Sequence, residues 1–477
     1  MGFPLSLSKL IHIVNAVFQN EGYCSIDTTK AITGINTDSR TVRPGEVFVA
    51  LEGSTFDGHE FLAQVHDAGA IAAIVRHIPS DKATPGLPLL QVDNTLAAYQ
   101  LIAHWWRHEQ ALPVVAITGS VGKTTTKELI AAVLSIKGSV LKTQANYNNE
   151  IGVPKTLLQI NETHDYAVIE MGMRGLGEIA ELTNIAAPDI GVITNVGTAH
   201  IGRLGSEEAI ARAKCELLEH LPSHGSAILN ADNQRLIDTA NTIWKGKTIT
   251  YGLTSGDIRG TVLDGDRLQV TGLSDSPISL PLPLIGPHNA LNYLASLAVV
   301  HALQIDDSTL LSALNQNLQV TLPSGRARKI TLQDDITILD ETYNAGFESM
   351  TAALQLLTST PGKRHIAVLG TMKELGDWSI ELHRRVGNLV EELNIDRLLI
   401  LADADEYQAL ANGARNVPRH QCSSKAEVLR ILNDLVTPGD RILFKASRSV
   451  GLDEVVEQFQ NSYTVSGELN QAPGNLS

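Results

Sequence analysis

A phosphate-binding loop is the clearest chemical signal in the sequence. It consists of Thr118, Gly119, Ser120, Val121, Gly122, Lys123, Thr124 and Thr125, between an apolar run and a helical stretch. Glycines let backbone amides curl around phosphate, and a helix N-terminus adds partial positive charge. Lys123 could reach the β- and γ-phosphates of a nucleotide, and the Thr124 hydroxyl could bind Mg²⁺. Ile117 breaks the strict GxxxxGK[ST] spacing. The loop predicts nucleoside triphosphate binding without separating an ATPase, a kinase and a ligase.

Three further side chains could support a metal ion. Glu170 ends the apolar run YAVIE, His200 follows the run IGVIT, and Lys214 lies in the helical stretch EEAIARAKCELLEH. A strand-end carboxylate and a histidine are ordinary metal ligands. Each also has a simpler interpretation: a solvated acid, a structural histidine and an exposed cation. Local sequence alone therefore does not assign them to a metal site.

The 477 residues that must position these groups suggest about three domains. Hydrophobic residues make up 43% of the chain, which is enough for buried cores. The formal net charge is −15, and this argues against general binding to nucleic acid or to an anionic membrane. The longest charge-free run, near 277–300, contains four prolines and predicts no stable membrane insertion. Cys24, Cys215 and Cys422 are far apart, and no signal peptide is indicated, so we expect a reduced, cytoplasmic location.

The apolar runs predict an α/β fold. The first hundred residues read as a small α/β unit with strands at 45–51 and 70–75 and a helix at 61–69, followed by a linker at 105–113. Strands at 114–118, 166–170, 190–194 and 226–229 alternate with helices and predict a parallel sheet. Segment 258–285, with Asp264-Gly265 as a turn, predicts an antiparallel insertion before a helix near Pro287. Strands at 336–340, 365–370, 397–401 and 441–445 predict another open parallel sheet, whose ligands should bind at the carboxyl ends of the strands.

Ten segments together resemble the Mur ligase family, the ATP-dependent amide-forming enzymes of peptidoglycan precursor synthesis. They are TGSVGKTT (118–125), NYNNEIGVP (146–154), EMGMRGLGEI (170–179), TNVGTAHIGRLGS (194–206), AKCE (213–216), GPHNALN (286–292), SGRAR (324–328), DETYNAG (340–346), VLGTMKELG (368–376) and KASRSVGLDEVV (445–456). The resemblance is greatest to the branch that adds D-alanyl-D-alanine to a UDP-N-acetylmuramoyl-tripeptide. The Asp-Asn-Pro-Arg motif of the diaminopimelate-adding branch does not occur in this sequence.

The resemblance implies roles for the nucleotide and metal side chains. Lys123 would contact the β/γ-phosphates, Thr124 and Glu170 would bind one Mg²⁺, and His200 would bind a second. Lys214 aligns with a lysine that is carbamylated in the family and would supply an anionic ligand to that second ion. The nucleotide would also contact Asn289 and Asn292 on the adenine side, Arg326 at the γ-phosphate and Asp340 at the ribose. Catalytic roles would fall to Lys123, Lys214, His200 and Arg326.

Other positions are implied for the two remaining substrates. Ser39 and Arg40, with Asp38 orienting Arg40, resemble a uridine-diphosphate region, and Asn148 and Asn149 would place the muramoyl peptide. Tyr343 and Asn344 would shape the nucleotide or amine site. Candidates for the incoming dipeptide are Lys373, Glu374, Ser447 and Arg448. Two positions depart from the family pattern: Val121 in the phosphate loop, whose amide should still serve phosphate, and Ala446, where a glycine is expected.

The resemblance implies a three-domain α/β architecture, with a central P-loop parallel-sheet domain and a Rossmann-like C-terminal domain. The predicted division is 1–110 for the UDP-substrate, 111–323 for ATP and 324–477 for the amine substrate and further nucleotide contacts. We expect ATP and Mg²⁺ as cofactors, UDP-N-acetylmuramoyl-tripeptide and D-alanyl-D-alanine as substrates, and a monomer that binds no nucleic acid. Two alternatives stay open: another branch of the family that adds an amino acid, and a P-loop ATPase acting as a conformational switch.

Overall fold

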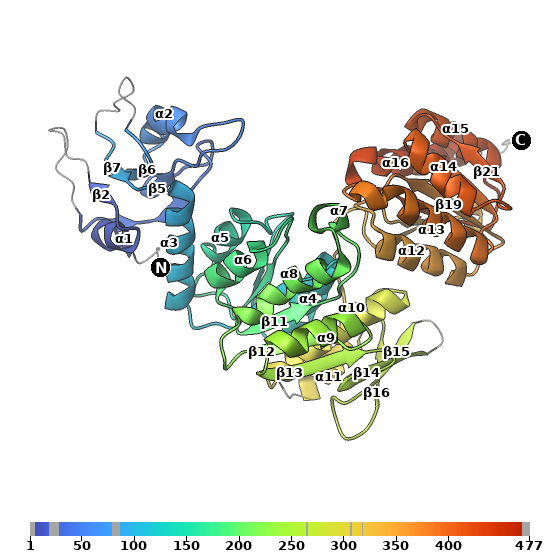
Figure 1. Ribbon diagram of the computed structural model, residues 1–477, viewed down its shortest axis with the longest axis horizontal. Coiled ribbons are helices and arrows are strands. Elements are labelled where there is room, and N and C mark those ends of the chain that lie inside the picture. The colour runs from blue at the N-terminus through green and yellow to red at the C-terminus, as the bar shows by residue number, and fades with distance from the viewer. Residues whose placement is uncertain are drawn as a thin grey trace, which may run out of the picture.

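The computed structural model describes residues 5–18, 28–78, 86–263, 266–305, 308–316 and 318–469. Figure 1 shows three α/β regions in a row, with the N-terminal region (blue) and the C-terminal region (orange and red) on either side of the central one. The main sheets lie within the predicted divisions 1–110, 111–323 and 324–477. The exact domain boundaries remain predictions.

The N-terminal region is built on five described strands. Their spatial order is β2 (Val17–Phe18), β7 (Leu89–Gln91), β6 (Ala72–Val75), β5 (Glu46–Val49) and β4 (Gly34–Asn36), and a separate pair joins β1 (Leu5–Ser6) to β3 (Ala31–Ile32). Its helices are α1 (Leu7–Ile13), α2 (Leu62–Asp67) and α3 (Thr95–Glu109). Apolar clusters lie around both faces of this small sheet. The two strands and the helix predicted for 45–75 are confirmed.

The linker predicted at 105–113 is wrong, because α3 continues through Glu109. Trp106 is 5% exposed, and its Nε1 donates to the carbonyl oxygen of Ile160 at 3.0 Å. Arg107 Nη2 donates to Asp189 Oδ2 at 2.8 Å. These side chains dock the end of α3 on the central region, and tertiary contacts therefore extend a helix that the local sequence left ambiguous.

Nine described strands form the central sheet. Their order is β16 (Ile278–Pro281), β15 (Arg267–Thr271), β14 (Ile258–Leu263), β13 (Lys247–Gly252), β12 (Ser226–Asn230), β11 (Ile190–Ile193), β8 (Val114–Thr118), β10 (Tyr166–Glu170) and β9 (Val140–Lys142). The pairs from β9 to β14 are parallel, whereas β14–β15 and β15–β16 are antiparallel. The predicted parallel sheet and antiparallel insertion are confirmed. The turn proposed at Asp264-Gly265 lies outside the described residues.

Helices cover both faces of the central sheet (Figure 1). They are α4 (Lys123–Leu134), α5 (Gly152–Leu157), α6 (Glu178–Ala186), α7 (Ile201–Leu204), α8 (Glu207–Glu219), α9 (Gln234–Ile243), α10 (Pro287–Ala302) and α11 (Ser308–Leu314). All five residues of β8 are buried, as expected for a strand between two helical layers. The Ser206 side chain caps α8 by accepting from Ala209 N, and α10 begins at Pro287 as predicted.

The C-terminal region has six described strands. Their order is β17 (Arg328–Thr331), β18 (Thr337–Asp340), β22 (Asp440–Lys445), β19 (Arg364–Gly370), β20 (Arg397–Leu401) and β21 (Arg419–Gln421), and only β17–β18 is antiparallel within this described sheet. The surrounding helices are α12 (Phe347–Ser359), α13 (Ser379–Glu392), α14 (Ala404–Gly413), α15 (Lys425–Leu435) and α16 (Leu452–Leu469). The predicted open parallel sheet is confirmed.

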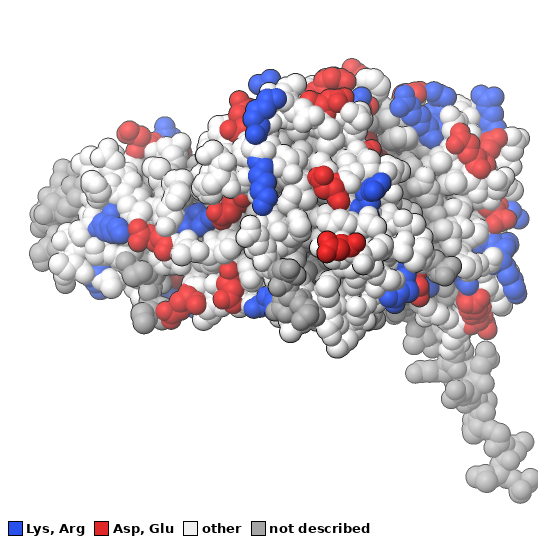
Figure 2. All heavy atoms as spheres, turned by 90° about the horizontal axis from the view of Figure 1, so that it is seen from below, with Lys and Arg blue, Asp and Glu red and all other residues white. Residues whose placement is uncertain are grey.

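The surface carries charges of both signs. On the face shown in Figure 2, acidic and basic side chains are interspersed among large uncharged areas. Among the described residues, no helix combines the length and apolarity needed to cross a membrane. Cys215 and Cys422 are buried free thiols, and Cys24 lies outside the described residues.

Candidate active site

The phosphate loop joins β8 to α4. Gly122 caps α4 with a φ of 83°, and a Cβ there would lie 2.7 Å from Asn292 Oδ1, so this position requires glycine. The first turn of a helix has amide groups without intrahelical partners, which suit a phosphate. Ser120, Val121, Gly122, Lys123, Thr124 and Thr125 all line a cavity of about 330 Å³. This cavity, the smaller of two at the site, is therefore a candidate nucleotide site.

The segment after β11 holds the phosphate loop in place. Asn195 Oδ1 accepts from the Val121 amide at 3.0 Å, and the Asn195 carbonyl accepts from the Ser120 amide at 3.1 Å. The Val121 amide thus donates to Asn195 in this structure, and its contact with phosphate remains a prediction. Gly119 is absent from the described lining of the cavity, and its carbonyl accepts from Lys123 Nζ at 2.7 Å. Burial lowers the pKa of Lys123, while nearby Glu170 opposes that effect.

Glu170 and Thr124 lie together in the smaller cavity and have the chemistry of a magnesium site. The Glu170 side chain is 3% exposed, and its Oε1 accepts from Asn148 Nδ2 at 2.8 Å. Its Oε2 is buried without a hydrogen-bond partner among the described residues. Oxygen ligands of this kind suit Mg²⁺. The unsatisfied oxygen is the observation that makes Glu170 fit a metal ligand.

Behind Glu170 lies a buried cation that the sequence reasoning did not identify. Lys127 is 1% exposed, donates to the Thr143 carbonyl at 2.7 Å, and lies 3.2 Å from Glu128 Oε1 and 3.8 Å from Glu170 Oε2. The apolar residues that follow Lys127 in α4 could have predicted its burial, because a helix that is apolar on most sides is buried together with its lysines. Lys127 compensates the two buried carboxylates.

His200 and Lys214, the remaining metal candidates, differ in their surroundings. His200 has a φ of 68°, and its Nδ1 lies 3.0 Å from Glu374 Oε2, without hydrogen-bond geometry. Burial, with help from Lys123 and Lys214, lowers the pKa of His200 to about 4. Lys214 is 1% exposed, and burial lowers its pKa well below the usual range. Both side chains are therefore held toward their neutral forms.

The predicted adenine-side residues lie in α10. Asn289 and Asn292 are both buried and line the smaller cavity. Asn289 Nδ2 donates to the Ile285 carbonyl at 2.8 Å, and Asn292 Oδ1 accepts from Thr126 Oγ1 at 3.1 Å. These bonds fix both amides at the wall of the cavity.

The C-terminal region closes the same cavity from the opposite side. Arg326, Tyr343 and Asn344 line it, and the Arg326 guanidinium lies 3.7 Å from the centre of the Tyr343 ring. Lys445 and Glu341, which the sequence reasoning missed, line it too. Lys445 Nζ donates to the Asn344 carbonyl at 3.0 Å, and burial raises the pKa of Glu341.

Asp340 is not brought into the described lining of this cavity. Its side chain is 2% exposed, and its Oδ1 accepts from Thr342 Oγ1 at 2.6 Å and from Thr342 N at 3.2 Å. The carboxylate thus supports the turn after β18. Its ribose contact remains a prediction.

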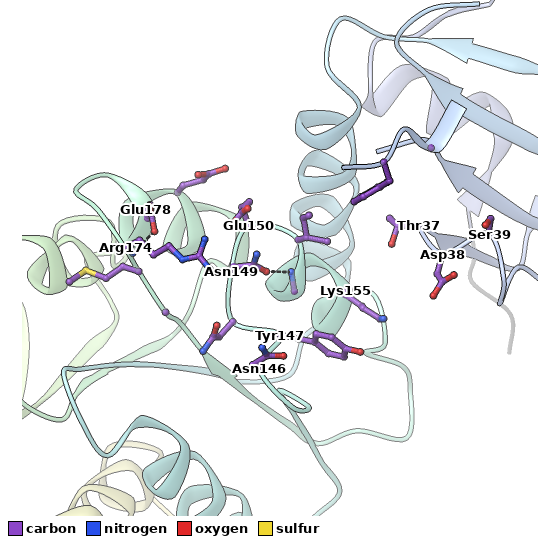
Figure 3. A pocket seen from close by; sticks show the side chains of 18 of the residues that line it. Thr37, Asp38, Ser39, Asn146, Tyr147, Asn149, Glu150, Lys155, Arg174 and Glu178 are labelled. Carbon is purple, nitrogen blue, oxygen red and sulfur yellow. Dashed lines mark hydrogen bonds between the residues drawn. The ribbon is translucent and has the colours of Figure 1, made fainter. Parts of the chain in front are cut away.

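The larger cavity, of about 1150 Å³, lies between the N-terminal and central regions. Ser39, Arg40, Asn148 and Asn149 all line it. Figure 3 shows Asn149 on the central wall and Ser39 on the N-terminal wall, with Lys155, an unpredicted cation, between them. Asn149 Oδ1 accepts from Gly152 N, the first residue of α5, at 3.0 Å. A substrate in this cavity could contact both regions at once.

The two cavities meet at four side chains. Lys123, Asn148, His200 and Glu374 line both the larger and the smaller cavity. A ligand in one cavity can therefore place a reacting group against a ligand in the other.

The C-terminal region also contacts the central region directly. Glu348 Oε1 accepts from Thr198 N at 2.6 Å, and its Oε2 accepts from Thr198 Oγ1 at 3.2 Å. Gly202 packs so closely on Gly376 that a Cβ on Gly202 would lie 2.6 Å from Gly376 N. No local sequence signal identified Glu348, because its partner lies 150 residues away.

The residues proposed for the incoming dipeptide are only partly assembled. Lys373 and Glu374 line the smaller cavity, whereas Ser447 and Arg448 are absent from its described lining. Lys373 pairs with Asp403 at 2.5 Å, and Arg448 pairs with Asp453 at 2.7 Å. Ala446 is fully buried, and a Cβ on Gly370 would lie 2.7 Å from its methyl group, so the departure from glycine is accommodated by packing.

The fold and the paired cavities define a three-region α/β nucleotide-binding protein. Three family models match consecutive parts of the chain: the Mur ligase family catalytic domain at 31–98, the Mur ligase middle domain at 117–300, and the Mur ligase glutamate ligase domain at 325–448. Together they cover most of the residues, and the chain belongs to the Mur ligase family.

Curated relatives match along nearly the whole chain. A UDP-N-acetylmuramoyl-tripeptide–D-alanyl-D-alanine ligase from Synechocystis sp. is 54% identical over 427 residues, covering 90% of this chain and 92% of the relative. The ligase of the same name from Escherichia coli is 35% identical over 474 residues, covering 96% and 99%.

Solved structures are similar over a comparable length. A crystal structure of MurF from Acinetobacter baumannii has a TM-score of 0.86 at 30% identity, covering 96% of this chain and 99% of that one. MurF ligase from Thermotoga maritima in complex with ADP has a TM-score of 0.82 at 28% identity, covering 93% and 100%. The three-domain architecture predicted from the sequence is thereby confirmed.

Proposed function

We propose that this chain is an ATP-dependent ligase that joins D-alanyl-D-alanine to UDP-N-acetylmuramoyl-tripeptide, with release of ADP and phosphate. The relatives of the same activity support this assignment. The observation that carries it is the junction of the two cavities at Lys123, Asn148, His200 and Glu374. An activated carboxylate must meet both the γ-phosphate of ATP and an amine, and this junction offers such a place.

Each cavity then has a task. The nucleotide would occupy the smaller cavity, with its phosphates on the first turn of α4 and beside Lys123. The ADP complex of a similar structure supports nucleotide binding. The uridine end of the muramoyl peptide would bind near Ser39 and Arg40, and its terminal carboxylate would reach Lys123. In domain terms, 1–110 would hold the UDP-substrate, 111–323 the ATP, and 324–477 the dipeptide.

The reaction follows from the weakness of a carboxylate as an electrophile. The substrate carboxylate attacks the γ-phosphorus of ATP, ADP leaves, and an acyl phosphate forms. The dipeptide amine attacks the acyl carbon, the tetrahedral intermediate collapses, phosphate leaves and the amine loses a proton. Lys123 and Arg326 would stabilise the charge on the transferred phosphoryl group, and the rest of the site would contribute mainly positioning.

Magnesium would be held by two sets of residues. Thr124 and Glu170 would bind the first ion, and His200 with Lys214 as its carbamate would bind the second. Bound Mg²⁺ would neutralise phosphate charge. A carbamate forms when a neutral amine adds CO₂ and releases a proton, and the buried, pKa-lowered Lys214 meets the requirement for a neutral amine. Burial lowers the pKa of His200 as well, so its imidazole would be neutral and able to bind a metal ion.

The decisive assay mixes purified protein, ATP, Mg²⁺, UDP-N-acetylmuramoyl-tripeptide and D-alanyl-D-alanine, and detects the pentapeptide nucleotide by mass. ADP release should require both substrates. A panel of free amino acids in place of the dipeptide tests the other family branches. Preference for a free amino acid would overturn the proposal, and ATP hydrolysis without any amide product would favour the switch-type ATPase.

A further inference from the structure

Arg326 is charged yet lacks a charged partner. Its Nε is buried without a hydrogen-bond partner, and among the described residues no carboxylate lies within ion-pair distance of its guanidinium. The Tyr343 ring instead lies against its face, 3.7 Å from ring centre to guanidinium carbon. Both side chains line the smaller cavity.

The main chain fixes this stacked pair. Tyr343 N donates to the Gly325 carbonyl at 3.0 Å, and Ala327 N donates to Glu341 Oε1 at 3.1 Å. Gly325 has a φ of 74°, and a Cβ there would lie 2.8 Å from Tyr343 N. The segments before β17 and after β18 are therefore held together on either side of the stack.

Stacking has a different consequence from an ion pair. A carboxylate would orient Arg326 but would also neutralise its charge and occupy its N–H donors. An aromatic face fixes the plane of the guanidinium while the in-plane donors stay available. We infer that Tyr343 is a positioning residue, which aims the Arg326 guanidinium at the terminal phosphate of bound ATP; this rests on the proposed function.

The test measures equilibrium binding of a non-hydrolysable ATP analogue and of ADP, each with Mg²⁺, to the full chain. Tyr343→Leu should weaken analogue binding by about fivefold to tenfold and change ADP binding by less than about twofold. Retained ADP affinity also shows that the variant is folded. Tyr343→Phe keeps the ring and should bind both ligands within about twofold of the parent protein.

A double-mutant cycle separates positioning from general structural support. In an Arg326→Met background, Tyr343→Leu should cause no further loss of analogue binding. Additive losses, or equal losses for ADP and the analogue, would overturn the inference. If Arg326→Met weakens analogue binding and Tyr343→Leu does not, the inference alone fails. If Arg326→Met has no effect on analogue binding, both the inference about Tyr343 and the proposed contact of Arg326 with the γ-phosphate are wrong. The product assay for amide formation tests the proposed function independently of this result.

Discussion

Asp38 accepts two hydrogen bonds from the Arg40 guanidinium, from Nε at 2.8 Å and from Nη2 at 2.7 Å. The Arg40 contact lowers the pKa of Asp38 to about 2, so the pair is ionised at neutral pH. The two residues stand at the N-terminal wall of the larger cavity. Asp38 thus orients Arg40, as predicted, and leaves Nη1 as the donor that can turn to a diphosphate.

Arg40→Ala should raise the KM for the UDP-muramoyl peptide by about tenfold, because a charge-assisted contact to the substrate is lost. The kcat should stay within about twofold, since this contact is far from the reacting carboxylate. Steady-state kinetics check both values. Arg43→Ala is the matched control, because Arg43 is outside the described lining of the cavity. An unchanged KM for the Arg40 variant would remove it from the substrate site.

Lys214→Ala should lower kcat by about 100-fold or more if the carbamate supports a metal ion. Short carboxylates added to the assay should restore part of the rate. Lys214→Arg keeps a cation that cannot take up CO₂, so it should be as inactive as the alanine variant. Full activity of the arginine variant would mean that Lys214 acts as a cation.

Lys127→Met should destabilise the protein by about 3–5 kcal/mol, because it leaves the buried Glu128 and Glu170 carboxylates without their shared cation. Lys142→Met is the control. Lys142 also pairs with Glu128 but is one-third exposed and forms no ion pair with Glu170 among the described residues, so a loss of about 1 kcal/mol or less is expected. Denaturant unfolding monitored by circular dichroism compares them, and equal losses would contradict the special role of Lys127.

Glu348→Ala should loosen the C-terminal region from the central one, because the Thr198 amide and hydroxyl lose their acceptor. Two bonds to a carboxylate contribute roughly 2–3 kcal/mol. Small-angle X-ray scattering of the unliganded protein should show a larger radius of gyration. Glu381→Ala, which removes an exposed surface pair on α13, should leave the radius unchanged.

The stability of the protein should decrease between pH 6.5 and pH 4 in part through His288. Burial, assisted by Lys445, lowers the pKa of His288 to about 4, while an unfolded histidine titrates near 6.5. The contribution of the neutral imidazole is therefore complete above pH 6.5 and is lost as the pH falls to 4, by roughly 3 kcal/mol at most. His288→Gln should flatten the dependence of Tm on pH over this interval. An identical slope in both proteins would show that other groups cause it.

The sequence predicted the elements well where burial is uniform along a strand. All residues of β8 and β22 are buried, and runs such as VVAIT and RILFK have few alternatives. Glu170 and His200, which end or follow strands, line the smaller cavity, because parallel strands place their carboxyl ends at one edge of a sheet.

The sequence does not show which polar groups become partners once the chain is folded. Asn195, 74 residues away, accepts the hydrogen bond of the Val121 amide, and the local sequence does not show this contact. The sequence predicts a linker at the end of α3, because the hydrogen bond from Arg107 to Asp189 that holds this end exists only in the folded protein. The sequence likewise does not show that Thr342 donates to the Asp340 carboxylate, whose ribose contact remains a prediction. Sequence periodicity predicts helices and strands, but it does not predict which polar groups will form hydrogen bonds with each other.

The contact between Gly202 and Gly376 has a mechanical consequence. Neither residue has a side chain, so the main chains of the central and C-terminal regions touch directly, and an added methyl group at Gly202 would wedge them apart. No side chains of these two residues interdigitate across the contact. A rotation of the two regions about the glycines would break no packing between their own side chains, whereas the Glu348–Thr198 hydrogen bonds and the apolar cluster shared by both regions would resist it.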